Sequence, residues 1–244
     1  MKRIIILFVS AIFLMSFTDP DADLILEKVD KNLSSKNRIF ESEMIIYGRR
    51  NTRTITSISY SVGDKQSFTE YLSPAREQGT KMLKLENALW IYSPSTDRII
   101  QISGHMLRQS IMGSDLSYED MMDDRKLTEI YSATISGHET IDDRDTYVLE
   151  LIAKVDDVAY YSQKIWVDKE YFVPLKQEMY AKSGQLLKQT ILSDIKQVQG
   201  RCFPMRMIYK DMLKDGKGTE FKMTSVKFDQ DIPEYIFTKA ALKQ

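Results

Sequence analysis

The sequence predicts a protein of the α+β class that is mainly antiparallel β. From residue 38 onward, apolar residues recur at every second position in many short runs, which is the period of a strand with one buried face. Short turn sequences separate these runs, and closely spaced strands joined by short turns form antiparallel hairpins. No long helical pattern lies between them, which argues against parallel βαβ units.

The N-terminus has the layout of a secretory signal peptide. Lys2 and Arg3 precede an apolar run from Ile4 to Phe17, and a polar stretch begins at Thr18. The run is about 14 residues long, whereas a membrane-spanning helix needs about 20. We therefore predict a signal peptide over residues 1–18, cleaved between residues 16 and 22, and an exported protein that is soluble after its removal. The alternative is an uncleaved N-terminal anchor.

Composition narrows the class of protein further. The hydrophobic fraction of 43% supports a core, and the formal net charge is −1. Because Cys202 is the single cysteine, no intramolecular disulfide forms. No basic surplus or stripe is present, so binding to nucleic acid is not expected. Without an internal repeat or a linker, residues 19–244 are predicted to form a single domain.

The first element of the mature chain is a predicted helix over residues 21–33. Ile25 and Val29 lie at helical spacing, and Asp21 or Asp23 is placed to cap its start. Strands are then predicted over residues 39–47, 55–62, 66–72, 80–85, 88–92, 98–102, 132–136, 146–153, 159–167, 172–180, 186–197, 202–211 and 219–228.

Residues 103–126 break the strand pattern. Glycines and polar spacers interrupt the alternation, and Ser117 begins a stretch with acidic residues in the first turn of a helix. We predict a loop with one or two short helices. A further helical turn is predicted over residues 232–238.

Many of the predicted strands carry apolar residues on both faces. Leu149 and Leu151 alternate with Val148 and Ile152, for example. A sheet with one solvated face does not show this pattern. Either protein covers both faces, or one face encloses a cavity.

Several segments together resemble a known family. These are residues 88–94 (ALWIYSP), 71–80 (YLSPAREQGT), 111–120 (IMGSDLSYED), 147–151 (YVLEL), 166–168 (WVD) and 174–176 (PLK). In combination they resemble the LolA-like family, in the branch usually labelled outer-membrane lipoprotein-sorting protein. The order of elements, helix first and then strands, extends the resemblance over essentially the whole mature chain.

The resemblance implies an unclosed antiparallel half-barrel of about eleven strands, with short helices forming a lid over the concave face. It also implies a periplasmic carrier that holds the acyl chains of a lipoprotein or another lipid while they cross the envelope. An inner- or outer-membrane protein is the expected partner, and the protein is expected to be a monomer. The alternative is a lipid-responsive sensor or adaptor working with a membrane protein or exporter.

A lipid site needs a large apolar concavity, and the flexible methionine side chain suits irregular apolar surfaces. We predict that one group of residues lines the sheet: Met44, Ile46, Trp90, Tyr92, Ile100 and Ile102. A second group would form the movable cover: Met106, Leu107, Ile111, Met112, Leu116, Met121 and Met122. Arg76 is a candidate contact for a lipid head group or a partner protein.

No catalytic residue, metal site or cofactor is predicted. The acidic run around residues 115–124 lacks the spacing of a calcium loop, and His105 and His138 lie far apart without a second ligand. Cys202 has no nearby histidine. Ser114 is not flanked by the glycines of a nucleophile elbow. A binding protein is therefore favoured over a hydrolase.

Overall fold

The computed structural model describes residues 20–48 and 51–244, so the predicted signal peptide over residues 1–18 lies outside the described residues. All the strands belong to one antiparallel sheet with the order β6-β5-β4-β3-β2-β1-β13-β12-β11-β10-β9-β8-β7. The sheet is unclosed, with β6 and β7 as its edges. The predicted fold class is confirmed, with thirteen strands where the family resemblance implied about eleven.

The helices of the described chain are short. They are α1 (Ala22–Leu33), α2 (Leu127–Ile130) and the 3₁₀ turns η1 (Gly104–Arg108), η2 (Ile111–Gly113), η3 (Glu119–Met121), η4 (Glu234–Phe237) and η5 (Ala241–Lys243). The strands are β1 (Asn37–Tyr47), β2 (Thr52–Val62), β3 (Gln66–Ser73), β4 (Lys81–Leu85), β5 (Ala88–Ser93), β6 (Arg98–Ile102), β7 (Tyr131–Ile141), β8 (Arg144–Ala153), β9 (Ser162–Asp168), β10 (Pro174–Tyr180), β11 (Leu186–Val198), β12 (Arg201–Asp211) and β13 (Thr219–Phe228).

Turn chemistry explains why neighbouring strands form hairpins. Asp142 and Asp143 both adopt positive φ between β7 and β8, and Gln199 and Gly200 do so between β11 and β12. Two consecutive residues with positive φ form the type I′ turn, whose twist matches that of the paired strands. These turns join strands that follow one another in sequence. The pairing of β1 with β13 instead joins the two ends of the sheet-forming chain.

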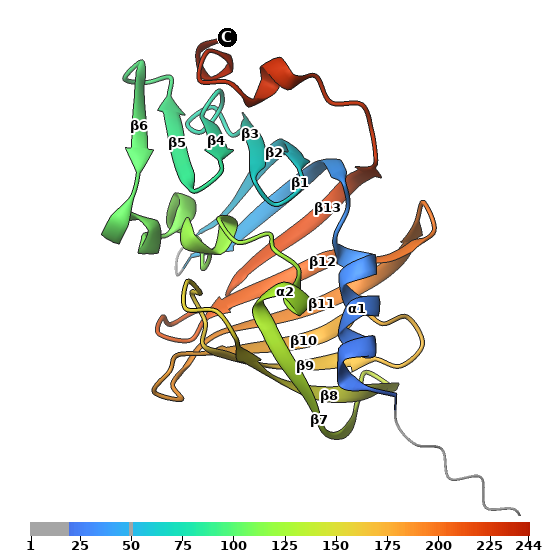
Figure 1. Cartoon of the computed structure of the whole chain (residues 1–244). Coiled ribbons are helices and arrows are strands. Elements are labelled where there is room, and N and C mark those ends of the chain that lie inside the picture. Colours follow the sequence, from blue (N-terminus) through green and yellow to red (C-terminus); the bar gives the residue numbers. More distant parts are fainter. Residues whose placement is uncertain (1–19, 49–50) are drawn as a thin grey trace, which may run out of the picture.

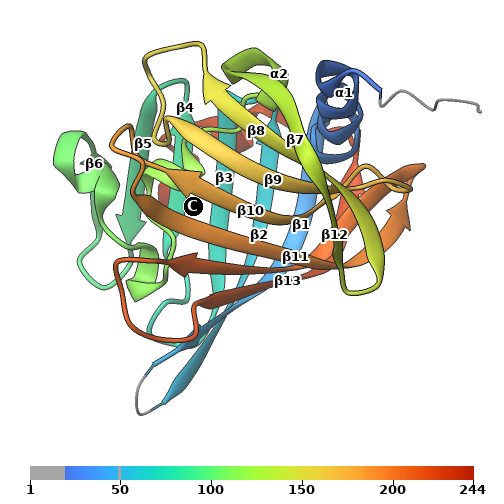
Figure 2. The same ribbon diagram turned by 90° about the horizontal axis from the view of Figure 1, so that it is seen from below.

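The sheet curves strongly, so that the β1–β6 arm and the β7–β12 arm face each other across an interior (Figure 1). Helix α1 and residues 103–126, called the lid below, lie on this concave side (Figures 1 and 2). Helix α1 starts at the cap that Asp21 provides to the amide of Asp23, 3.1 Å away. Its buried Ile25, Leu26 and Val29 pack on the concave residues of β7–β9.

Segments at both ends of the chain complete the packing. Asp30 of α1 accepts hydrogen bonds from the amides of Leu127 (2.9 Å) and Thr128 (3.0 Å), which fixes α2 against α1. Turns η4 and η5 cover the convex face of the β2–β5 arm, where Leu242 is fully buried. Across residues 20–48 and 51–244, no helix combines the length and apolar character needed to cross a bilayer.

Candidate functional site

The concave face is apolar at one end of the strands and carries hydroxyl groups farther along them. Cross-strand partners share a face, so the pairs Met44–Ile55 and Met44–Phe221 place apolar side chains on the inside of β1, β2 and β13. Farther along the same strands the inward positions carry hydroxyls. Ser42 and Ser57 lie 3.1 Å apart, oxygen to oxygen, and Ser59 and Thr69 lie 2.8 Å apart.

The lid packs against the apolar end of this face. A cluster of buried residues comprises Met44, Ile46, Ile55, Tyr71, Met82, Leu89 and Ile102 of the sheet. Lid residues pack on them, partly buried: Met106, Leu107, Met112, Tyr118, Met121 and Met122. The methionines of the lid thus fill the concavity over β1–β6.

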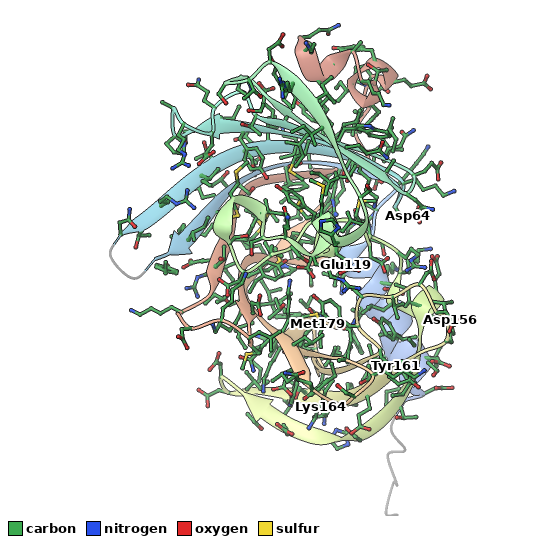
Figure 3. All side chains as sticks on the ribbon, turned by 90° about the vertical axis from the view of Figure 1, so that its left-hand side faces the viewer. Asp64, Glu119, Asp156, Tyr161, Lys164 and Met179 are labelled. Carbon is green, nitrogen blue, oxygen red and sulfur yellow. The ribbon has the colours of Figure 1, made fainter. Side chains whose placement is uncertain are left out.

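Next to the lid cluster lies an inner cavity of about 410 Å³. Its apolar wall comes from β1, β11, β12 and β13 and consists of Phe40, Leu192, Phe203, Met207, Phe221, Met223 and Val226. Hydroxyls of the neighbouring strands β2 and β3 continue the wall beside β1, and lid residues including Leu116 and Met121 cover the cavity. Glu119 of the lid and Met179 of β10, which both line the cavity, lie in the interior between the two arms (Figure 3). Its volume falls within the roughly 300–1,000 Å³ of small-molecule sites.

A buried polar group joins the lid to the cavity wall. Asp120 pairs with the ammonium of Lys188 and accepts a hydrogen bond from the hydroxyl of Tyr160. Burial, and then the charge of Asp120, raise the pKa of Tyr160. Burial also raises the pKa of Tyr209, a further lining residue, to about 12. Both phenols therefore remain protonated at neutral pH and act as hydrogen-bond donors.

Two further side chains fasten the lid. Arg53 of β2 donates to the carbonyl oxygen of Met112 at 2.5 Å. Asp115 accepts hydrogen bonds from the hydroxyl of Thr219 (2.9 Å) and the amide of Asp211 (3.0 Å). Hydrogen bonds of this kind can be exchanged for hydrogen bonds to water. The lid is therefore held to the sheet by such bonds together with the packing of its methionines.

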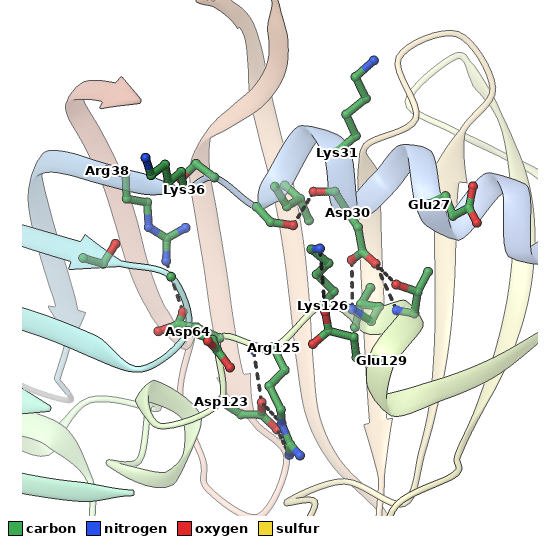
Figure 4. A pocket seen from close by; sticks show the side chains of 18 of the residues that line it. Glu27, Asp30, Lys31, Lys36, Arg38, Asp64, Asp123, Arg125, Lys126 and Glu129 are labelled. Carbon is green, nitrogen blue, oxygen red and sulfur yellow. Dashed lines mark hydrogen bonds and ion pairs between the residues drawn. The ribbon is translucent and has the colours of Figure 1, made fainter. Parts of the chain in front are cut away.

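A polar vestibule of about 820 Å³ lies beside the inner cavity, between α1, the β2–β3 turn and the end of the lid. Figure 4 shows Asp30 on α1, Arg38 on β1, and Asp123 and Arg125 on the chain that follows η3. Arg125 pairs with Asp123 at 2.8 Å, and Arg38 pairs with Asp124 at 3.1 Å. The vestibule thus carries charges of both signs beside a largely apolar cavity.

The structure brings together eight of the thirteen residues predicted to line a lipid site. Met44, Ile46, Ile102, Met106, Leu107, Met112, Met121 and Met122 belong to the lid cluster. Leu116 is buried and, with Met121, lines the inner cavity. Ile111 is buried, and its amide donates a hydrogen bond to the carbonyl oxygen of Leu116 within the lid.

The remaining predicted residues lie elsewhere. Trp90 and Tyr92 pack on the convex face against the C-terminal turns, which corrects the prediction that they line the same wall as Met44. The reason is that Leu89 and Ile91 occupy the inward positions of β5. Ile100 is 48% exposed on the edge strand β6. Arg76, whose side chain is 85% exposed, lines neither cavity.

Sequence reasoning missed the wall formed by the C-terminal strands. Phe203, Met205, Met207 and Tyr209 alternate along β12, a period-two pattern that marks one apolar face. The pattern alone does not predict that this face lies opposite the lid. That arrangement depends on the pairing of β1 with β13. Within the described residues, no cluster of His, Cys, Asp and Glu is arranged to hold a metal ion.

Comparison with known proteins identifies the fold. A family model described as "Uncharacterized protein" matches residues 63–244. A putative outer membrane lipoprotein-sorting protein domain from Vibrio parahaemolyticus is 26% identical, with a TM-score of 0.78 over 91% of this chain and 98% of that one. A search of the curated proteins finds no match.

Two other solved structures agree. A DUF1329 family protein from Desulfovibrio piger is 25% identical, with a TM-score of 0.81 over 90% of this chain and 97% of that one. A LolA superfamily protein from Nitrosomonas europaea is 28% identical, with a TM-score of 0.76 over 91% of this chain and all of that one (100%). The chain belongs to the LolA-like superfamily, in its outer-membrane lipoprotein-sorting branch.

Proposed function

We propose that the protein is a periplasmic carrier that binds an acyl chain of a lipoprotein or another lipid in the inner cavity and moves it across the envelope. The observation that supports this most is the cavity of about 410 Å³, bounded by apolar β11–β13 side chains and covered by lid residues that include Leu116 and Met121. Burial of an acyl chain contributes about 0.8 kcal/mol per methylene group. An apolar wall that makes no specific contacts therefore supplies enough affinity for an acyl chain, and binding needs no catalytic groups.

Release of the ligand requires the lid to move. The contacts of Asp115, Asp120 and Arg53 hold the lid closed. A membrane partner that binds the open form preferentially would shift the population toward release. The similarity to a putative outer membrane lipoprotein-sorting protein domain supports a carrier over an enzyme. The alternative is a sensor that binds lipid without transferring it, and an assay of lipid transfer to membranes distinguishes the two.

A cavity-filling substitution tests the site. Met223→Trp places a larger ring on the cavity wall, whereas Thr224→Trp places the same ring on the exposed, opposite face of β13. We expect Met223→Trp to weaken binding of a fluorescent fatty acid at least tenfold, because the ring occupies the volume that the chain needs. Thr224→Trp should bind as the wild type does. Equal binding of the fatty acid by both variants would show that its acyl chain binds outside the inner cavity.

A further inference from the structure

The vestibule and the inner cavity adjoin each other and share part of their lining. Both are lined by Leu33, Arg38, Asp124 and Gln177, among other residues. The lining of the inner cavity is largely apolar, whereas charged residues dominate that of the vestibule. An amphiphile whose chain occupies the inner cavity therefore places its head group in the vestibule.

Arg38 lies at the boundary between the two spaces. Its Nη2 atom pairs with Asp124 at 3.1 Å, and its guanidinium lies over the ring of Phe40, 5.6 Å from the centroid. The Nε atom is buried and has no hydrogen-bond partner within the described chain. A buried donor without an acceptor is costly. A ligand oxygen at this boundary removes that cost.

A second polar atom of the cavity wall has the same property. The hydroxyl of Thr190 is buried without a partner, and the residue is 2% exposed. Thr190 lies on β11 and lines the inner cavity. A ligand that carries several oxygen atoms, as an ester-linked lipid does, can supply a partner to Arg38 Nε or to this hydroxyl.

The charges of the vestibule favour a particular kind of head group. Its lining contains six basic and six acidic residues, so its formal charge is zero. Arg125 and Asp123 lie 2.8 Å apart, and Lys126 and Glu129 lie 3.7 Å apart. A purely anionic head group gains no net attraction from such a lining, because its acidic residues are as numerous as its basic ones. A head group with both signs finds a complement for each.

We propose that the vestibule binds the zwitterionic head group of a phospholipid-like ligand, with a head-group or ester oxygen accepting a hydrogen bond from Arg38 Nε. This inference rests on the proposed function, since the acyl chain occupies the inner cavity. It specifies the ligand class by head group, which the fold alone does not.

Isothermal titration with two lysophospholipids of the same acyl chain tests the proposal. We expect the wild type to bind the ethanolamine form about tenfold more tightly than the anionic glycerol form. Arg38→Met retains an apolar stem but removes the donor. The affinity of this variant for the ethanolamine form should therefore be about tenfold lower than that of the wild type. Arg98→Met, on the exposed end of β6 and outside both cavities, is the matched control and should bind as the wild type does.

The outcomes separate this inference from the carrier proposal. Equal or tighter binding of the glycerol form by the wild type, or unchanged binding by Arg38→Met, overturns the head-group assignment while leaving the cavity as an acyl site. Absence of binding by both lysolipids and by a plain fatty acid overturns both. If Arg38→Met does not fold, Arg38→Lys keeps the charge beside Asp124 and removes Nε. It should show the same loss for the ethanolamine form.

Discussion

Glu220 lies on the convex side of β13, outside the proposed ligand site, and its buried carboxylate interacts with two neighbours. It accepts a hydrogen bond from Arg206 Nε at 2.7 Å and another from the hydroxyl of Tyr47 at 2.5 Å. The hydrogen bond from Arg206 lowers the pKa of Glu220 from 4.5 to about 2, although burial acts in the opposite direction. A carboxyl group with a lowered pKa stabilises the fold where it is ionised, and this contribution is lost as the pH falls through its folded pKa.

The substitution Glu220→Gln is therefore expected to lower the free energy of unfolding by about 2 kcal/mol at pH 7. The difference between variant and wild type should shrink as the pH falls from about 4.5 toward 2, because the wild-type carboxylate is then protonated. Urea titrations at pH 7 and pH 3 measure both values. A difference that is the same at the two pH values would contradict the assignment of the charged group.

Alternation along a strand placed some of the predicted residues on the face that the lid covers and misplaced others for a definable reason. Met44 and Ile46 were placed on one face of their strand by period two, and the structure puts both in the lid cluster. For β5 the same rule offers two apolar faces, one with Leu89 and Ile91 and one with Trp90 and Tyr92. Only the position of turns η4 and η5 decides between them, and that contact is not encoded in the strand itself.

At the scale of elements, the lid is the segment on which the proposed carrier mechanism depends. Thr219 of β13 is fully buried, and its hydroxyl both donates to Asp115 Oδ2 and accepts from the amide of Asp115, each at 2.9 Å. Valine has a similar shape but makes neither hydrogen bond. Thr219→Val should therefore weaken the attachment of the lid by about 2 kcal/mol.

Hydrogen exchange measures this loosening directly. Amides of the lid around Asp115 and Leu116 should exchange at least tenfold faster in Thr219→Val, while those of α1 keep their wild-type rates. Thr224→Val, an exposed position on the same strand, is the control. Unchanged exchange in the lid would show that methionine packing alone holds it closed.

The sequence predicts the elements better than their arrangement. Thirteen runs with a strand period correspond to the thirteen strands, and the Asp21 cap starts the first helix. The irregular composition of residues 103–126 also indicates a segment outside the sheet. The wall of β11–β13 was missed because its position opposite the lid depends on the long-range pairing of β1 with β13. Local patterns carry no information on that pairing.

At the scale of the whole molecule, one curved sheet supports two spaces with different chemistry. Helix α1 fills the concavity at β7–β9, and the lid fills it over β1–β6. The inner cavity remains between them, and the charged vestibule lies beside it. On the convex side, η4 and η5 cover the apolar residues of β2–β5. The strands thus carry apolar residues on both faces for two reasons. Turns η4 and η5 cover the convex face, whereas α1, the lid and the inner cavity occupy the concave face.

Native mass spectrometry of the protein purified from its native host, with extraction of any bound lipid, tests the central claim most directly. We expect a co-purifying acylated species that is displaced by added lysophospholipid and is absent from Met223→Trp. A mass equal to that of the bare chain, with no uptake of added phospholipid or lipopeptide, would contradict the claim. The methionines of the lid would then be ordinary core residues.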